Sequence, residues 1–371
     1  MRKMFGLIVI AVLLGGFCLA DLSSAALAPS GPIKWKLQSA NPAGTPQIDL
    51  LNKMAASIDK MSAGRLKIEV LSGGAIVNPF EILDGVNKGI VEAGQWWTHY
   101  SMGKNPSGSL FSSPLGGAGS GLDMMNHLSW YMKGGGRELY VEFYQKILKA
   151  DVMPFLIAPD GPEAFGWAKK APKTLQDYLK MRYRMSSGLS SDVLKDMGGI
   201  PVNVAGVELI PALERGVIDG GEWINTASDL KLGLYDVAKN YSLQGLHQAI
   251  GIMDIMINGN AWRALPPDLQ AIVEVATTQS ILDGIMYFVE ENAKALNVLT
   301  KEKGVKLFDA PAGYSEAFIK SSKKVLAKFE AQDPFFKKVL DSQRKYAHLV
   351  VPYTNETKKL MQLISGAAKV K

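Results

Sequence analysis

Cysteine is almost absent from this chain of 371 residues, in which Cys18 is the only one. We expect residues 1–26 to be removed, which leaves a mature chain without cysteine. Such a chain forms no disulfide and has neither a cysteine nucleophile nor a thiolate metal site. Its stability must therefore come from a hydrophobic core, for which a hydrophobic content of 47% is sufficient.

Catalytic motifs are lacking as well. The sequence contains no P-loop, no HExxH and no GxSxG motif. The glycine-rich segment Gly117–Gly121 lacks the spacing of a dinucleotide-binding turn, and we interpret it as a flexible loop. The histidines show no paired metal spacing; they are His99, His127, His247 and His348. We therefore predict that the protein is not an enzyme.

The N-terminus has the layout of a secretory signal peptide. Arg2 and Lys3 precede the apolar run Met4–Leu14, and small residues follow. We predict a signal peptide at residues 1–26, cleaved after Ala26, and a periplasmic location for the mature protein.

Three alternatives for this segment are weighed against that prediction. Cleavage after Ala20 also fits the small residues. An uncleaved membrane anchor is disfavoured because the apolar run is shorter than the roughly 20 residues of a membrane span. Lipid attachment at Cys18 is disfavoured because the bulky Phe17 stands where a small residue is required.

Positive charge is in slight excess. The formal net charge is +6, and loss of residues 1–26 lowers it to +5. In the lysine-rich stretches 301–306 and 320–328, charged and apolar residues alternate at helical spacing, which is typical of solvated helix faces. We therefore predict no nucleic-acid partner, although a mildly basic protein attracts small anions.

Strand and helix patterns alternate after the N-terminus. Ile33–Ser39 and Arg65–Leu71 alternate apolar and polar residues like half-buried strands, and Thr45–Met61 and Phe80–Lys88 have helical spacing. Gly89–Gly94 leads into a third strand. This order predicts a parallel sheet with helical crossovers.

The same alternation restarts near Asp151, which predicts a second, similar lobe. The predicted elements are strands at Val152–Ile157, Val202–Val204, Val217–Trp223 and Tyr241–Leu246, helices at Leu189–Met197, Val207–Arg215 and Asp229–Asn240, and a short helix with a strand within Leu175–Arg184.

The C-terminal third is helical. Pro266–Lys303 has a nearly unbroken helical pattern, and a helix of that length is about 50 Å long, enough to bridge two lobes. Further helices are predicted at Tyr314–Gln332, Pro334–Ala347 and Asn355–Ala367.

Four segments at the ends of predicted strands are candidates for ligand binding, because the carboxyl edge of an open α/β sheet is where ligands bind. They are Gln95–Pro106, Pro159–Trp167, Arg182–Arg184 and Ile218–Asn225. Ordinary aromatic packing, a solvated loop or a surface salt bridge are the alternatives in each case.

Two of these segments suggest particular chemistry. An arginine at the end of a strand can bind a carboxylate through two parallel hydrogen bonds, and strand alternation alone does not choose between Arg182 and Arg184. Glu222, together with a backbone carbonyl, can coordinate a hard cation such as Na⁺ or Ca²⁺.

Several ordered motifs resemble one known family, the extracellular solute-binding proteins of TRAP transporters (DctP-type, family 7). The resemblance extends from about Ile33 to Tyr346. It is carried by Leu71–Gly74 with Asn78–Glu81, by Asp177–Arg184, and by Pro211–Trp223. The final Glu-Trp pair resembles the branch that binds 2-oxo and 2-hydroxy monocarboxylates, such as lactate, together with a cation.

The resemblance implies a role for each matching residue. Arg184 would pair with the ligand carboxylate. Glu222 would ligate a Na⁺ or Ca²⁺ ion with its side chain, Trp223 would ligate it with its carbonyl oxygen while its ring contacts the ligand, and Gln248 would complete the cation site.

Three further ligand contacts follow less directly from the same resemblance. Glu163 stands where this branch often has glutamine, and a carboxylate beside an anionic ligand requires a cation or a proton to offset it. Asn105 and Tyr100 would contact the ligand from the first lobe.

The implied architecture is a two-lobed α/β periplasmic-binding-protein fold with mixed sheets and a long lobe-spanning helix. The expected limits are 33–154 with 249–302 for lobe I and 155–248 for lobe II, with C-terminal helices packed across the lobes in 303–371. The implied partners are a small organic acid and the membrane permease subunits of a TRAP transporter.

Other functions remain possible at this point. The ligand could be a different carboxylate, an aromatic acid or a polyol. The closed protein could signal to a receptor kinase in place of a permease. A periplasmic lyase using Glu163 or Glu222 as a base is the enzymatic alternative, which the lack of an activated nucleophile disfavours.

Overall fold

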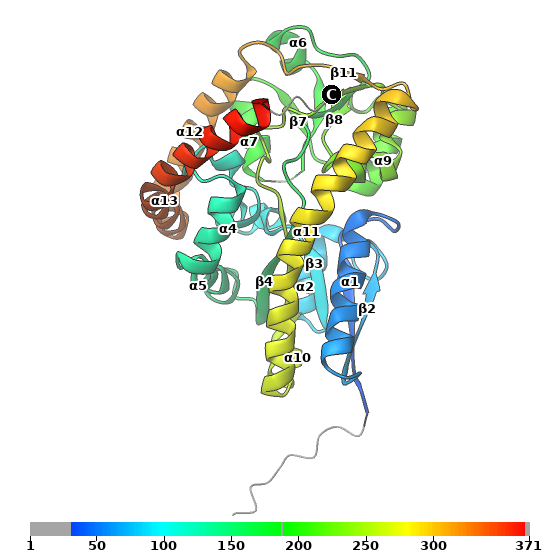
Figure 1. Cartoon of the computed structure of the whole chain (residues 1–371), viewed down its shortest axis with the longest axis vertical. Coiled ribbons are helices and arrows are strands. Elements are labelled where there is room, and N and C mark those ends of the chain that lie inside the picture. Colours follow the sequence, from blue (N-terminus) through cyan, green and yellow to red (C-terminus); the bar gives the residue numbers. More distant parts are fainter. Residues whose placement is uncertain (1–30, 187, 368–371) are drawn as a thin grey trace, which may run out of the picture.

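The computed structural model describes residues 31–186 and 188–367. The signal peptide predicted at residues 1–26 therefore lies outside the described residues. The chain forms a two-lobed α/β structure with two mixed sheets, one near each end of the molecule (Figure 1). This confirms the predicted fold class.

The first sheet combines strands from distant parts of the chain. In spatial order it contains β2 (Leu66–Leu71), β1 (Ile33–Ser39), β3 (Ala93–Trp96), β10 (Ile252–Asn258) and β4 (Val152–Pro159). β1 is parallel to β2 and β3, as predicted, whereas β10 runs antiparallel to β3 and β4.

The second sheet is built from short strands. In spatial order it contains β11 (Lys306–Leu307), β9 (Asn240–Ser242), β5 (Gly166–Ala168), β8 (Gly220–Gly221), β6 (Arg182–Arg184) and β7 (Ile200–Val202). β6 is parallel to β7 and β8, while β5 is antiparallel to β8 and β9.

Helices cover both sheets (Figure 1). The shorter ones are α1 (Pro46–Met61), α2 (Ile82–Asn87), α3 (Ser109–Ser112), α4 (Met124–Lys133), α5 (Gly136–Glu142), α6 (Leu175–Leu179), α7 (Leu189–Asp196), α8 (Leu209–Glu214), α9 (Thr226–Leu232) and α10 (Gly259–Arg263). The three long ones are α11 (Pro267–Lys301), α12 (Tyr314–Gln332) and α13 (Pro334–Ala367).

The long helix α11 connects the two halves of the molecule. It packs against α1 and β4 beside the first sheet and against α9 beside the second (Figure 1). By length and hydropathy it would also suit a membrane span, but these contacts are those of a bridging helix. The prediction of a lobe-spanning helix is therefore confirmed, while the residue limits given for each lobe stay a prediction.

Two C-terminal helices were predicted where the structure has one. The predicted break between Pro334–Ala347 and Asn355–Ala367 is wrong, because α13 continues through Pro352. Proline removes one backbone donor from a helix. Pro352 and His348, whose carbonyl loses that donor, are both exposed, so water can supply the missing hydrogen bond.

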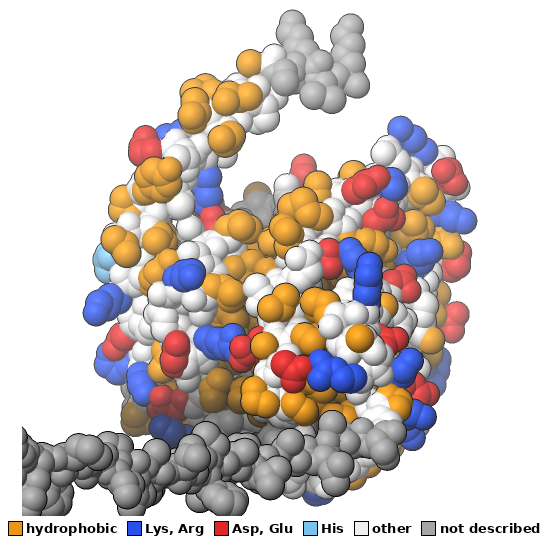
Figure 2. Space-filling view, turned by 60° about the horizontal axis from the view of Figure 1, so that its bottom comes forward, with side chains coloured by type: hydrophobic (Ala, Val, Ile, Leu, Met, Phe, Trp, Pro, Cys, Tyr) orange, Lys and Arg blue, Asp and Glu red, His pale blue; other side chains and the backbone are white. Residues whose placement is uncertain are grey.

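The end of α13 carries apolar side chains into solvent. Figure 2 shows it projecting from the body of the molecule with hydrophobic groups along it. The exposed residues are Leu349, Tyr353, Leu360, Met361, Leu363 and Ile364.

Some predicted elements are displaced or shortened. The strand predicted at Val202–Val204 is β7, and the one at Val217–Trp223 is reduced to β8, since only Gly220 and Gly221 pair with neighbouring strands. The helix predicted at Asp229–Asn240 is α9, which ends at Gly233 because this residue adopts a left-handed φ of 83°.

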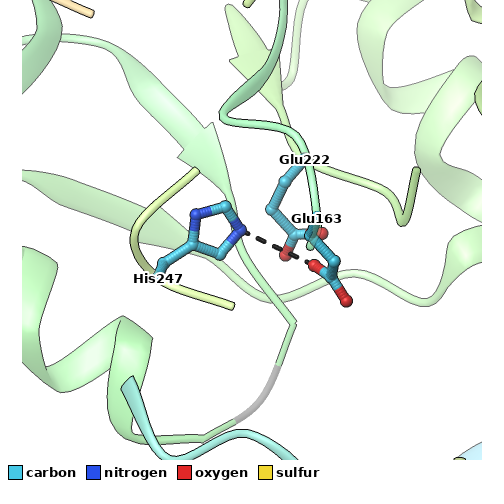
Figure 3. Close-up of side chains that lie close together, drawn as sticks. All are labelled: Glu163, Glu222 and His247. Atoms are coloured by element: carbon cyan, nitrogen blue, oxygen red, sulfur yellow. Dashed lines mark ion pairs between the residues drawn. The ribbon is translucent and has the colours of Figure 1, made fainter. Parts of the chain in front are cut away.

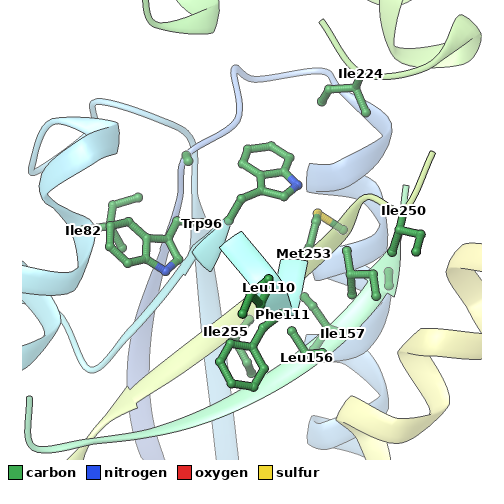
Figure 4. Packing of buried hydrophobic residues seen from close by; sticks show 14 of the residues in the cluster. Ile82, Trp96, Leu110, Phe111, Leu156, Ile157, Ile224, Ile250, Met253 and Ile255 are labelled. Atoms are coloured by element: carbon green, nitrogen blue, oxygen red, sulfur yellow. The ribbon is translucent and has the colours of Figure 1, made fainter. Parts of the chain in front are cut away.

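The strand β10, which lies between β3 and β4, is part of the hydrophobic core. All of Ile252–Asn258 is buried, as expected for a strand covered on both faces. Figure 4 shows Met253 and Ile255 on this strand and Leu110 and Phe111 of α3 among the neighbouring side chains.

One carboxylate interrupts this apolar strand. Asp254 is fully buried and accepts hydrogen bonds from the hydroxyl groups of Tyr140, Tyr144 (2.6 Å) and Thr98 (2.9 Å). Burial raises the pKa of Asp254 to about 6, and the three hydroxyl donors limit the rise. The carboxylate thereby ties α5 and the turn after β3 to the central strand.

We predict that Asp254→Ala lowers the free energy of unfolding by about 3 kcal/mol, because it leaves buried hydroxyl groups without an acceptor. The control is Asp84→Ala, which removes an exposed ion pair with Lys104 and should cost less than about 1 kcal/mol. Urea denaturation followed by tryptophan fluorescence measures both. Equal losses in the two variants would contradict the assigned role of Asp254.

Candidate solute-binding site

A small cavity lies where the two lobes meet. Its empty volume is about 210 Å³. One group of lining residues follows β3, and the other belongs to loops of the second lobe. The lining residues are Trp97, His99, Tyr100, Glu163, Arg184, Ser186, Trp223, Ile224 and Gln248.

Arg184 is buried at the carboxyl end of β6, with 1% of its side chain exposed. Its Nη1 donates to the carbonyl oxygen of Glu222 (3.0 Å) and to Oε2 of the same residue (2.6 Å), and its Nε donates to the carbonyl oxygen of Val204 (3.2 Å). Within residues 31–186 and 188–367, its Nη2 has no acceptor. Arg184 lines the cavity, so its guanidinium can meet an anion bound there.

The structure separates the two arginines that the sequence left open. Arg182 begins β6, is 45% exposed and is paired with Asp219 at 2.7 Å. Two residues later the strand has reached the space between the lobes, where Arg184 lines the cavity. Only Arg184 is therefore placed to meet a ligand.

Glu222 follows β8 and is as deeply buried as its arginine partner. Its Oε1 accepts a hydrogen bond from the backbone N–H of Ser186 at 2.5 Å. The close approach of β8 to β6 requires glycine, because a Cβ atom on Gly221 would lie 2.6 Å from the Cβ atom of Arg184.

Trp223 forms one wall of the cavity. Its ring lies 5.5 Å from the guanidinium carbon of Arg184, a cation–π geometry. A Cβ atom on Gly206 would lie 1.8 Å from this ring, so a glycine is required there. The indole Nε1 of Trp223 is buried without a hydrogen-bond partner in the described part of the chain.

Glu163, Gln248 and His247 form a connected polar group beside the cavity. Gln248 donates from Nε2 to Oε1 of Glu163 (2.5 Å) and accepts from the hydroxyl of Ser186 (3.0 Å). His247 Nε2 lies 3.6 Å from Oε2 of Glu163 (Figure 3). One ligating atom each from Glu163, Glu222 and His247 lie within 4.8 Å of one another.

The electrostatics of this group favour added positive charge. Burial raises the pKa of Glu163 well above its usual value, and the nearby carboxylates of Glu222 and Asp160 raise it further. Burial also raises the pKa of Glu222, and the positive charge of Arg184 partly lowers it again. Burial lowers the pKa of His99 and of His247 to about 3. The carboxylates of Glu163 and Glu222 and the neutral His247 thus offer ligand atoms that fit a cation.

A larger depression lies elsewhere, on the outer surface of the second lobe. Its empty volume is about 1000 Å³, and it is open to solvent. Its lining includes Lys169, Lys170, Lys173 and Lys180. It contains none of the predicted site residues and lacks the buried, unpartnered polar atoms of the cavity between the lobes.

Comparison with known proteins identifies the family. The sequence profile of the bacterial extracellular solute-binding proteins, family 7 (DctP), matches residues 37–333. The chain belongs to this family. It is a TRAP-type solute-binding protein, which confirms the predicted family. The family consists of extracellular solute-binding proteins and not of enzymes, which confirms the prediction that the protein is not an enzyme.

Individual relatives agree with the family assignment. A monocarboxylate 2-oxoacid-binding periplasmic protein of a Nostoc species is 28% identical over 315 residues, or 85% of this chain and 84% of the relative. A TRAP solute-binding protein from Pseudoalteromonas atlantica was solved with bound sodium and pyruvate. It is 28% identical to this chain with a TM-score of 0.81, and the match covers 89% of this chain and 98% of that protein. One from Bordetella bronchiseptica (24% identical, TM-score 0.85, 91% and 98% covered) shares the fold.

Most of the predicted site residues of this solute-binding protein are brought together, and one is not. Tyr100 lines the cavity with Arg184, Glu163, Trp223 and Gln248. Glu222 does not line it but is paired with Arg184.

Asn105 does not line the cavity. Its Oδ1 accepts from the backbone N–H of Ser107, and its Nδ2 donates to Asp333 at 2.8 Å. Both polar atoms of the side chain are thereby engaged in holding the turn against the C-terminal helices, outside the cavity. A contact between Asn105 and the ligand stays a prediction.

Three polar residues at or beside the cavity were not predicted from the sequence, namely Ser186, His99 and His247. Ser186 follows Arg184 closely, and His99 lies inside a segment that the sequence singled out. His247 precedes the predicted ligand Gln248, but a lone histidine without a paired partner gave no signal. Its neighbours Glu163 and Glu222 are distant in sequence and are joined only by the fold.

Asp229 of α9 supports the loop that carries Trp223. It accepts hydrogen bonds from Trp167 Nε1 (2.8 Å) and from the backbone N–H of Ile224 (3.3 Å). Burial raises the pKa of Asp229 to about 7. A raised pKa in the folded state contributes stability at low pH, and this contribution is lost as the pH rises through about 7.

We therefore predict that Asp229→Asn flattens the dependence of stability on pH. Between pH 4 and 7 the unfolding free energy of the variant should gain on that of the wild type by about 1.4 kcal/mol per pH unit. Urea titrations at several pH values measure this difference. The control is Asp84→Asn at an exposed site, and an equal pH profile for wild type and Asp229→Asn would refute the prediction.

Proposed function

We propose that this TRAP solute-binding protein captures a small 2-oxo or 2-hydroxy monocarboxylate, together with a cation, between its lobes and delivers it to TRAP membrane permease subunits. The observation that carries the proposal is the buried guanidinium of Arg184, whose Nη2 has no acceptor within the described ranges. A carboxylate of the ligand would complete its hydrogen bonding.

The surrounding groups support a ligand with a second oxygen. Trp223 Nε1 is a buried donor without a partner in the described residues and could donate to an oxo or hydroxyl group. Glu222, the carbonyl of Trp223 and Gln248 are the proposed cation ligands. A cation held there would neutralise the carboxylates and bind ligand oxygens.

The known ligands of relatives support the same choice. The Nostoc relative is described as a binder of monocarboxylate 2-oxoacids. The Pseudoalteromonas structure contains sodium and pyruvate, and a structure from Colwellia psychrerythraea, also 28% identical, contains calcium and pyruvate.

Lobe closure follows from the placement of these residues. Trp97, His99 and Tyr100 face the cavity from the first lobe, and Arg184 and Trp223 face it from the second. A ligand that touches both groups binds the closed form more tightly than the open form and shifts the balance toward closure. The closed form is then the one that the permease would recognise.

An aromatic acid is a second candidate ligand. The indole rings of Trp97 and Trp223 and the ring of Tyr100 line the cavity, and flat ring systems stack favourably on such side chains. A screen that includes pyruvate, lactate and benzoate separates the two candidates.

We predict that Arg184→Lys weakens the binding of pyruvate by about 30-fold or more, because lysine keeps the charge but cannot hold Glu222 and the carbonyl of Val204 while it also donates to the ligand. Isothermal titration calorimetry, with calcium or sodium present, measures the dissociation constant. Arg182→Lys is the matched control on the same strand and should bind like the wild type. Unchanged affinity in Arg184→Lys would remove this arginine as the anchor.

A further inference from the structure

One pair of hydrogen-bonded side chains crosses between the lobes outside the cavity. Gln47 lies in the first turn of α1, which packs on β2 of the first sheet. Ser228 lies in the first turn of α9, which is tied to β5 of the second sheet through Asp229 and Trp167. Nε2 of Gln47 donates to Oγ of Ser228 at 2.9 Å, and this hydroxyl donates to Oε1 of Gln47 at 3.3 Å.

The two side chains depend on each other. Both residues are 0% exposed, and within residues 31–186 and 188–367 neither side chain has another hydrogen-bond partner. Figure 1 shows α1 and α9 in different halves of the molecule, with α11 running past both. Separation of the lobes would return the amide and the hydroxyl to water. When the lobes meet, each group needs the other, because a buried polar group without a partner is costly.

The pair also acts on one wall of the cavity, although neither member lines it. Asn225 is the N-cap of α9: its Oδ1 accepts from the backbone N–H of Ser228 (3.0 Å), and its Nδ2 donates to the carbonyl oxygen of Asp160 (2.8 Å). Asn225 follows Trp223 and Ile224, which line the cavity. A side chain of the first lobe that holds Ser228 therefore also holds the segment that carries Trp223.

We propose that the pair of Gln47 and Ser228 is a latch between the lobes, which forms when they meet, positions the Trp223 wall and slows release of the solute without touching it. The inference rests on the proposed function. A solute enters the open form, so its entry does not require the latch. Its release requires opening, and opening breaks the latch. Gln47 is thus a positioning residue that acts through Ser228.

The first test measures the rates of pyruvate binding and release by stopped-flow tryptophan fluorescence. In Ser228→Ala and in Gln47→Leu, the dissociation rate should rise about 5-fold, the effect of one lost hydrogen bond, while the association rate stays within about 2-fold of wild type. The control is Ser129→Ala, which removes a hydroxyl bonded to Tyr346 at 2.6 Å between α4 and α13 and should change neither rate. Unchanged dissociation in both latch variants would overturn the proposal.

A double variant tests whether the two residues act through one contact. If they do, Gln47→Leu combined with Ser228→Ala should release pyruvate no faster than the faster single variant, because the contact can be lost only once. Independent, multiplying effects on the dissociation rate would refute the pairing. Thermal melting shows whether each variant is folded.

A measurement without solute separates this inference from the proposed function. If wild type binds none of pyruvate, lactate and benzoate, the proposed function fails, and the latch is decided in ligand-free protein by single-molecule FRET. Dyes are attached through Lys67→Cys and Lys170→Cys, exposed positions beside the first and second sheets, in the mature chain 27–371, which has no other cysteine. The closed population should fall about 5-fold in Ser228→Ala. Equal closed populations would overturn the latch.

Discussion

The buried ion pair between Arg184 and Glu222 determines where the loops of the second sheet lie. Arg184 and Glu222 are each 1% exposed, and removing two charges from water is costly unless further hydrogen bonds complete their shells. Those bonds come from the backbone of Ser186, Val204 and Glu222 itself. The ion pair therefore fixes the loops after β6, β7 and β8 at one edge of the second sheet, which is where the cavity forms.

Much of the fold followed from local patterns, and much of the site followed from motifs. The alternation in Ile33–Ser39 and the helical spacing of Tyr314–Gln332 gave elements with the observed bounds, because burial on one face imposes these periods. β10 was not assigned, since a buried strand pairs with partners that are distant in sequence. α13 continues past Pro352 because this residue is exposed and water can replace the lost hydrogen bond. The sequence alone does not show that the proline is exposed.

The site shows where residue patterns stop being informative. Strand alternation places Arg182 and Arg184 on one face, yet only the second reaches the space between the lobes. Asn105 lies close in sequence to cavity residues, but its amide is held by Ser107 and Asp333. His247 meets Glu163 only through the packing of two loops. Each of these outcomes is decided by long-range contacts that spacing along the chain does not encode.

The cavity between the lobes contains buried polar atoms that a bound solute could satisfy. His99 Nε2, Glu163 Oε2, Trp223 Nε1 and His247 Nε2 are buried and lack hydrogen-bond partners among the described residues, and each such group costs about 1–3 kcal/mol. Opening the lobes would let water satisfy them. An acid and a cation would satisfy them in the closed form. The solute would therefore favour closure because it replaces, in the closed form, the hydrogen bonds that water provides in the open form.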